Sequence, residues 1–599
     1  MTSADAAPLA VAVPLLASAG VAALVSLKAQ RAAQAIAIAA AAATAVLCAV
    51  LLHTSRTDAV VYWFGGWHPR HGVAIGVDFA VDPLGAGFAL LAALLVTTGL
   101  IAGIRYFEGL GQVLFSGLML ILLAGIVGFS LSGDLFNMFG FFEVVNVTAI
   151  ALTVHQNEEE APIQGAVNFL VANAAGAIMI LVGIGLLYGH TGALNLAQIG
   201  RATAADPDAA AVVVGLAVIG VGLFTKAGLA PFHFWLVDAY AAAPAPVAVV
   251  FPGVMCELGL LGFVRVMHLA TGATLNAHAS AMSDVLLAGG AVTAVVGAVG
   301  CLVQQHLKRL IAFATVAHIG AFMVGIGLLD PEGLSGTAIW VVGDAFAKAA
   351  LFIVAGHVLR SFGTADIGML HGRGRTLPAA GVLFALGALV VSAVPPTGVF
   401  VGKSVVDAAA ETAGDPWVPY LLLAVSALVG GSLLAAGGRV FLGIGVPVPT
   451  RPREGDGGEP SGSRRPGVVL LLPGILLAAA FLMPLVPDLT AESHRAAEHV
   501  TDRSSYAAHV LDGTPQHVPL PEVPGLKPKD WALGFAATAG ALAVAAASLL
   551  GARRLGELSL GRAAVRLLRA PYTGRTGDQV AWMLVGAAAF TTAVTFAAR

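Results

Sequence analysis

The chain has 599 residues, of which 58% are hydrophobic and only 11% are charged. Soluble proteins carry about 25% charged residues, so this composition excludes a soluble globular protein and predicts a membrane protein. The formal net charge of -3 supplies no basic surface, and nucleic acid is therefore not an expected partner.

Apolar segments long enough to cross about 30 Å of hydrocarbon recur along the whole chain. The first lacks the basic lead-in of a signal peptide, so we interpret it as the first span. We predict an all-α polytopic membrane protein with about 14–16 transmembrane helices. In chain order, the predicted spans cover residues 7–27, 33–52, 82–104, 112–131, 134–154, 163–187, 209–240, 244–264, 281–303, 310–329, 335–359, 377–411, 417–438, 467–486, 531–551 and 579–597.

Lys and Arg residues number 31, and most of them lie in the loops that follow odd-numbered spans. Cytoplasmic loops collect positive charge, so this distribution predicts that both termini lie outside a bacterial-type cell (inner) membrane. Arg265 is assigned to a loop after the eighth span. Only Lys226, Lys348 and Lys403 lie within apolar segments.

The part of the chain after residue 442 is predicted to be an extension with about three further helices. The Arg/Gly/Pro-rich segment 445–467 and the polar segment 488–530 are predicted to be loops or poorly ordered linkers. A basic segment, 555–569, could lie on the membrane surface. Histidines in the second segment fit no standard metal-site spacing, so we predict no metal site. They are His494, His499, His509 and His517.

Three isolated cysteines, in apolar runs, form no CxxC pair and no ligand-like cluster. This pattern supports neither a disulfide framework nor an iron–sulfur cluster, and no nucleotide-binding glycine motif is present. We therefore expect no cofactor and no redox chemistry in this chain. The cysteines are Cys48, Cys256 and Cys301.

Six ionisable side chains interrupt successive apolar segments. A charge at mid-bilayer costs about 2.5–3.5 kcal/mol even on insertion scales, so such residues usually face the protein interior and mark an ion path. One isolated residue of this kind could equally be a structural polar group satisfied by a neighbour, but a series in successive spans favours a proton path. The candidates are Glu143, Lys226, Glu257, His318, Lys348 and Lys403.

Prolines predict a break in two of these segments. Pro231 follows Lys226 by five residues, and Pro395 and Pro396 precede Lys403. A proline removes a backbone donor and clashes with the preceding turn, so the helix should break or kink there. Broken helices in transporters lie at mid-membrane, where freed backbone groups and water can meet an ion.

Further polar residues could modulate the path. Asp344 and Lys348 stand four residues apart, which places them on one helical face as a relay pair or as a permanent structural bridge. His233 and Asp238 follow the first break and could be structural groups or relay members. Glu143 and Lys226 are interpreted as partners on adjacent helices, whether or not they touch.

Five segments together resemble the antiporter-like proton-translocating subunits of Mrp Na+/H+ antiporters (the D and A subunits), of respiratory complex I and of membrane-bound hydrogenases. The resemblance covers about residues 80 to 410, with the motifs in the family's order and spacing. The segments are GDLFNMFGFFEVVNVTAIAL, FTKAGLAPFHFWLVDAYAAAPAPV, HLKRLIAFATVAHIG, DAFAKAALF and PPTGVFVGKSVVD.

The resemblance implies two inverted five-helix repeats, each with one broken helix. It implies N-terminal helices over 1–111, a first repeat over 112–265, a second over 281–442 and an extension over 443–599. It places Glu143 and Lys226 in the first half-channel, and Lys348, Lys403 and His318 in the second. Two positions depart from the family: Glu257 replaces a common lysine, and Asp344 replaces a common histidine.

Three functions are compatible with these features. The first is a proton-conducting, Mrp D-like subunit of a multisubunit cation/proton antiporter, with protons as the transported ion and Na+ as the candidate for the exchanged cation. The second is a proton-pumping membrane subunit of a complex I-like (NADH-quinone oxidoreductase) or hydrogenase complex, in which partner chains perform the electron transfer. The third is a non-transporting scaffold. All three predict other membrane subunits as partners.

Overall fold

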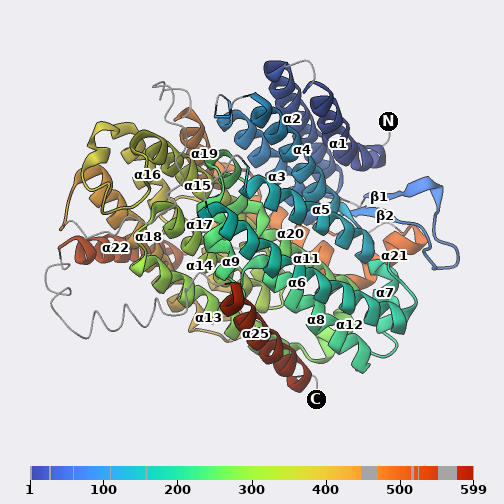
Figure 1. Cartoon of the computed structure of the whole chain (residues 1–599). Coiled ribbons are helices and arrows are strands. Elements are labelled where there is room, and N and C mark those ends of the chain that lie inside the picture. Colours follow the sequence, from blue (N-terminus) through green and yellow to red (C-terminus); the bar gives the residue numbers. More distant parts are fainter. Residues whose placement is uncertain are drawn as a thin grey trace.

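The computed structural model describes residues 3 to 597, apart from residues 26–28, 58–59, 105, 108, 156–159, 447–469, 515–517, 522, 524 and 551–575. The described chain is predominantly helical (Figure 1). A small hairpin of β1 (Val60–Trp63) and β2 (Asp78–Val81) was not predicted. The strands are antiparallel, and Trp63 pairs with Asp78. Figure 1 shows the hairpin at the right-hand edge of the helical body.

Within the described residues, thirteen helices are long and apolar enough to cross a membrane, or fourteen if one bent pair is counted. The prediction of a polytopic helical membrane protein is therefore confirmed. Twelve of these spans contain α1 (Ala6–Ala23), α2 (Gln30–Thr54), α3 (Pro83–Ala102), α4 (Gly109–Leu131), α5 (Leu135–Thr153), α6 (Glu160–Thr191), α8 (Ala210–Ala227), α13 (Ala279–Val303), α14 (Leu307–Gly327), α15 (Pro331–Phe362), α18 (Val418–Gly437) and α22 (Pro528–Leu550).

The remaining span, residues 245–270, is continuous but irregular. It consists of α10 (Ala245–Ala248), a π-helical turn, α11 (Glu257–Arg265) and a second π-helical turn. π-Helical turns occur frequently at functional sites, because they change the direction in which the following side chains point. Here one of them directly precedes Cys256 and Glu257. All residues of this span are buried.

Both predicted breaks are present. α8 ends at Ala227, and Gly228 adopts a positive φ of 74° as its left-handed cap. The chain then passes Pro231 before α9 (Phe234–Ala242) begins, and the backbone N–H of Ala230 donates to Thr293 Oγ1 of α13 at 3.1 Å. The second break separates α16 (Pro378–Val391) from α17 (Gly398–Ala413), with Pro395 and Pro396 between them.

One local pairing occurs twice in the chain. Asp134 pairs with Asn195, and His306 pairs with Asp366, as isolated β-bridges. Each bridge joins the start of one helix (α5 or α14) to the loop after the following helix (α6 or α15), and a broken helix comes next in both cases. This recurrence supports two repeats of one fold. The domain boundaries themselves remain a prediction.

The prediction of a loop or poorly ordered linker over 488–530 is wrong for its first half. Residues there form α20 (Leu489–Thr501), which packs on α15, and α21 (Arg503–Asp512), which packs on the short helix α7 (Leu196–Thr203). Tyr506 and Val500 are buried against the body, whereas the outward residues are polar. The segment therefore has too few apolar residues for its helices to be predicted from the sequence.

The other helices of the extension are α19 (Leu471–Leu482), α22 and α25 (Thr576–Ala597). α22 packs mainly on α18, and α25 packs on α8 and α6. Figure 1 shows α25 in dark red across the lower part of the body and α22 at its left-hand side. Almost all of the predicted linker 445–467 and the predicted surface segment 555–569 lie outside the described residues.

Candidate functional site

The six ionisable residues predicted for the path lie on six different helices of the body: α5, α8, α11, α14, α15 and α17. All except Glu143 are buried, and Lys226, His318 and Lys348 are fully enclosed. The structure gathers them into four groups. Each group contains a polar partner that was not predicted for the path or was predicted only as a modulator.

The first group surrounds Lys226. Its ammonium Nζ donates to Asn146 Oδ1 at 2.6 Å, and Asn146 Nδ2 donates to Glu143 Oε1 at 3.1 Å. Glu143 and Lys226 are therefore connected through the amide of Asn146, rather than forming the direct pair that their residue types suggest. Phe142 and Phe169 also face the ammonium, with ring centroids at 5.4 and 5.5 Å. Asn146 stands one helical turn after Glu143 on α5, a signal present in the sequence.

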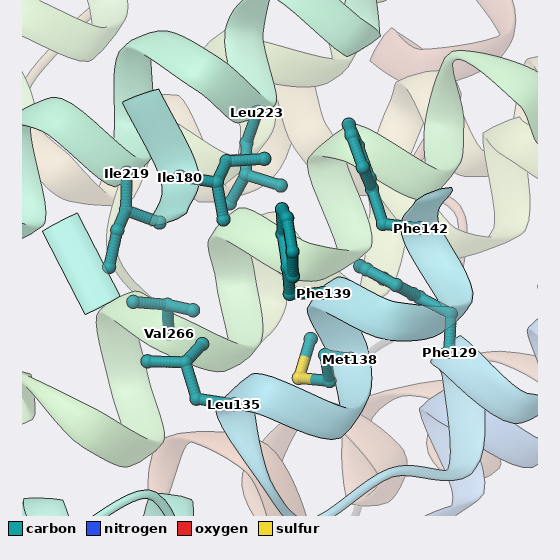
Figure 2. A pocket seen from close by; sticks show the side chains of 9 residues that line it. All are labelled: Phe129, Leu135, Met138, Phe139, Phe142, Ile180, Ile219, Leu223 and Val266. Atoms are coloured by element: carbon teal, nitrogen blue, oxygen red, sulfur yellow. The ribbon is translucent and has the colours of Figure 1, made fainter. Parts of the chain in front are cut away.

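An apolar cluster closes one side of this group. Figure 2 shows its side chains pointing toward one another from α5, α6 and α8 and from the chain around Phe129 and Val266. The cavity between them is about 10 Å³, which is at the lower limit of the space that one water molecule needs. The lining residues are Phe129, Leu135, Met138, Phe139, Phe142, Ile180, Ile219, Leu223 and Val266.

The second group connects the two halves of the body. Cys256, for which no role was predicted, interacts electrostatically with Lys226, Lys348 and Glu257. The Tyr240 hydroxyl lies 2.9 Å from Cys256 Sγ and donates to the Phe251 carbonyl at 2.8 Å. Glu257 itself interacts with Lys348 and Asp344. An acidic group thus interacts with the charges of the second half at a position where the family commonly has a lysine.

The third group centres on Asp344. Its Oδ1 lies 2.7 Å from His318 Nδ1, and its Oδ2 forms an ion pair with Lys348. The predicted contact of Asp344 and Lys348 on one helical face is confirmed. One carboxylate thus contacts two basic groups, and the role of Asp344 as a modulator of the path stays a prediction. Trp340 packs edge-on against the His318 ring, with centroids 5.5 Å apart.

Lys403 has its own partner on α17. Its Nζ donates to Asp407 Oδ2 at 2.5 Å, and both side chains are buried. Asp407 was not predicted as a site residue, although it closes the segment PPTGVFVGKSVVD four residues after the lysine. A base four residues before an acid lies on the same helical face, so the spacing itself was the available signal.

The two residues predicted after the first break lie at the start of α9 and within it. Asp238 Oδ1 forms an ion pair with Arg309 at 3.1 Å, and its Oδ2 accepts from Asn168 at 3.3 Å. His233 is buried, and its ring packs against Phe234 with centroids 4.3 Å apart. Asp238 thus joins α9 to α14 and α6.

A further buried charge cluster lies at the end of α11, and it corrects the assignment of Arg265 to a loop. Arg265 is fully buried, forms an ion pair with Asp82 at 3.1 Å and donates to the Ser130 carbonyl at 2.5 Å. Asp78 on β2 accepts from Asn195 at 3.0 Å. Burial raises the pKa of Asp78 to about 7, and the nearby Asp134 adds to the effect. Arg265 closes an apolar span, so its sequence position did not reveal its burial.

The comparisons with known proteins agree with this architecture. Residues 132–429 match the family described as NADH:quinone oxidoreductase/Mrp antiporter. The D subunit of the Na(+)/H(+) antiporter of Bacillus subtilis (strain 168) is 27% identical over 406 residues, which are 66% of this chain and 78% of the relative. The N subunit of the NADH-quinone oxidoreductase of Desulforudis audaxviator (strain MP104C) is 30% identical over 371 residues, which are 61% of this chain and 72% of the relative.

A solved structure is similar across most of the chain. One chain of the Mrp complex from Dietzia sp. DQ12-45-1b superposes with a TM-score of 0.75 at 25% identity, covering 85% of this chain and all of that chain (100%). The helical architecture and the sequence relatives therefore agree. The chain belongs to the NADH:quinone oxidoreductase/Mrp antiporter membrane family, and it is an antiporter-like, multi-pass membrane subunit.

Proposed function

We propose that this chain is the proton-conducting, D-like subunit of a multisubunit cation/proton antiporter. The observation that carries the proposal is the series of buried ionisable groups that runs through the body. It leads from Glu143 and Asn146 to Lys226, then past Cys256 to Glu257, and on to the Asp344 group and Lys403. Groups of this kind are expensive to bury and mark ion paths in membrane proteins.

The contacts indicate how a proton would advance. Lys226 can release a proton because its neutral amine is tolerated among apolar rings, and Asn146 relays its hydrogen bond to Glu143. A proton that reaches Glu257 neutralises this carboxylate, and Lys348 then interacts with Asp344 alone. The ion pair tightens, and the charge state of the first half is thereby communicated to the second.

Glu257 therefore occupies the position of the family's lysine, but its charge changes in the opposite sense: the carboxylate is neutral when it carries a proton, whereas a lysine is charged. A lysine there would repel Lys348, whereas the carboxylate attracts it. We propose that Glu257 carries protons between the halves and alternates between a charged state, which attracts Lys348, and a neutral state. The same contacts would serve proton pumping in an NADH-quinone oxidoreductase-like complex, and the 30% identity to an N subunit makes that the second candidate.

We propose the remaining assignments on the same basis. The relatives named as subunits make other membrane subunits the expected partners, with H+ and Na+ as the exchanged ions. The distribution of Lys and Arg supports a cell membrane location with both termini outside. Genes for small Mrp-type subunits beside the gene for this chain would support the first function, and genes for quinone-oxidoreductase or hydrogenase subunits the second.

The decisive experiment measures proton flux in vesicles that contain the whole complex. Lys226→Ala and Glu143→Ala are expected to abolish Na+-driven proton flux, because each removes one end of the hydrogen-bonded chain through Asn146. Glu498→Ala is the control, since this carboxylate lies on α20 and pairs only loosely with His494, at 3.5 Å. Normal flux in both path variants would refute the proton path, and flux driven by an electron donor instead of Na+ would favour the second candidate.

A further inference from the structure

Three ionisable residues form a ladder along one face of α17. Lys403, Asp407 and Glu411 are spaced four residues apart, so successive side chains lie about 6 Å apart along the helix axis. The exposed fraction of their side chains rises along the ladder, from 2% to 4% and then to 39%. Among the described residues Asp407 Oδ1 has no hydrogen-bond partner, and Asp407 interacts electrostatically with both of its neighbours. The ladder thus leads from a buried ammonium to the surface.

The helix α22 covers the outer end of this ladder. Lys529, near its start, forms an ion pair with Glu411. Two residues later, Trp531 packs against Phe400 with ring centroids 5.2 Å apart. Gly534 lies directly on the broken helix, because a Cβ there would approach both Pro395 and Phe400 to 2.7 Å.

A corresponding arrangement occurs at the first break. Asp238 follows Pro231 by seven residues, as Lys403 follows Pro396, and its side chain is 19% exposed. Asp238 forms an ion pair with Arg309, just as Lys403 does with Asp407, but with the charges exchanged along the chain. Both broken helices therefore carry a charged, paired side chain two turns beyond the proline.

The helix α25 covers this first position in the same manner. Gln579 donates to Asp238 Oδ2 at 3.4 Å, and the Trp582 ring lies 6.3 Å from that of Phe234. A Cβ at Gly586 would overlap the Pro231 ring. α22 and α25 thus present a polar residue, a tryptophan and a glycine in the same order to the two breaks. Simple packing of two apolar helices does not require this repeated order.

We propose that Asp238 and the Asp407–Glu411 ladder are the two groups through which the path exchanges protons with water, and that α25 and α22 cover them. This inference rests on the proposed function as a proton path. At the outer end, the N–H bond of the Lys403 ammonium breaks as an O–H bond forms on Asp407. The proton then passes to the Glu411 carboxylate and from there to water, so charge and protons balance at each step.

The ion pair with Lys529 keeps Glu411 ionised between transfers. Asp530 also interacts electrostatically with Asp407, and Tyr420 interacts electrostatically with Lys529. These groups therefore contribute to the electrostatic potential at the ladder. Without the nearby Lys529 ammonium, the Glu411 carboxylate binds a proton more tightly, and a proton can then occupy the ladder. The Lys529 ammonium at the start of α22 thereby sets how tightly Glu411 binds a proton.

The test uses the whole complex in proteoliposomes, with proton flux measured as a function of pH. Asp407→Asn, Glu411→Gln and Asp238→Asn are each expected to lower the flux at least tenfold, while Glu411→Asp restores most of it. Lys529→Gln is expected to move the pH profile to higher pH. Asp415→Asn is the matched control, because this carboxylate lies just beyond α17 and bonds only to the Trp417 indole, at 3.0 Å.

The outcomes separate this inference from the proposed function. Wild-type flux in Asp407→Asn and Glu411→Gln, together with lost flux in Lys226→Ala, would overturn the ladder and leave the path intact. Wild-type flux in Asp407→Asn, Glu411→Gln and Lys226→Ala would overturn both the ladder and the proposed proton path. Glu411 is at the surface, where an ion pair contributes little to stability, so Glu411→Gln should assemble normally. An unchanged pH profile in Lys529→Gln would refute the proposal that α22 influences the protonation of Glu411.

Discussion

Asn146 provides the sharpest test of the contacts in the first half of the body. Asn146→Leu keeps the branched shape of the side chain but removes the acceptor for Lys226 and the donor for Glu143. A hydrogen bond to a charged group contributes about 1.5–3 kcal/mol. Because each 1.36 kcal/mol changes a rate about tenfold, we expect proton transfer through this point to slow by about tenfold to about a hundredfold.

The assay is Na+-driven proton flux in proteoliposomes that contain the assembled complex. Thr148→Val is the control, because Thr148 lies on the same helix and its hydroxyl bonds only to the Val144 carbonyl within α5. Asn146→Asp should keep much of the flux, since a carboxylate still accepts from Lys226. If Asn146→Leu and Thr148→Val carry the same flux as the unmodified chain, the amide is not part of the path and the reasoning fails.

Three further predictions concern other groups of the body. Glu257→Lys should lower flux at least tenfold, because the new ammonium would repel Lys348, with which Glu257 interacts electrostatically; flux equal to that of the parent would make the replacement incidental. Asp344→Asn leaves His318 and Lys348 without their shared carboxylate and should destabilise the chain by about 3–5 kcal/mol, measured as a lower midpoint in thermal unfolding in detergent. Asp78 has its pKa raised from 3.8 to about 7, so the folded state binds this proton more tightly and the contribution to stability is lost as pH rises between these values. Asp78→Asn should therefore gain thermal stability relative to the parent at pH 8 and little at pH 4; an equal gain at both would contradict the assignment.

The sequence was informative wherever one short segment carries the whole signal. The spans follow from runs of apolar residues, and the breaks follow from Pro231, Pro395 and Pro396, because a proline disrupts a helix by local geometry alone. The contact between Asp344 and Lys348 follows from the helical period. The amphipathic helices α20 and α21 were missed because their apolar face is narrow and their overall composition is polar.

The path candidates were visible as charges in apolar segments, but their partners were not. Tyr240 and Cys256 are uncharged, and nothing in their own segments distinguishes them from residues that fill space; the only signal for Asn146 is its place one helical turn after Glu143. Their roles arise from contacts between distant parts of the chain, such as the bond between Lys226 and Asn146 over 80 residues. Arg265 also appeared to be a loop residue, because the chain that buries it comes from β2 and α3.

The sequence by itself determined that the chain lies in a lipid bilayer, where its helices lie, and which ionisable residues fall within apolar spans. Those properties depend on composition and on period, which act over one or two turns. Only the tertiary structure decided which charges share a carboxylate, which amide connects Glu143 to Lys226, and that α22 and α25 lie on the two breaks. Such pairings depend on how the helices pack, and packing joins residues whose separation in the chain carries no information about their distance in space.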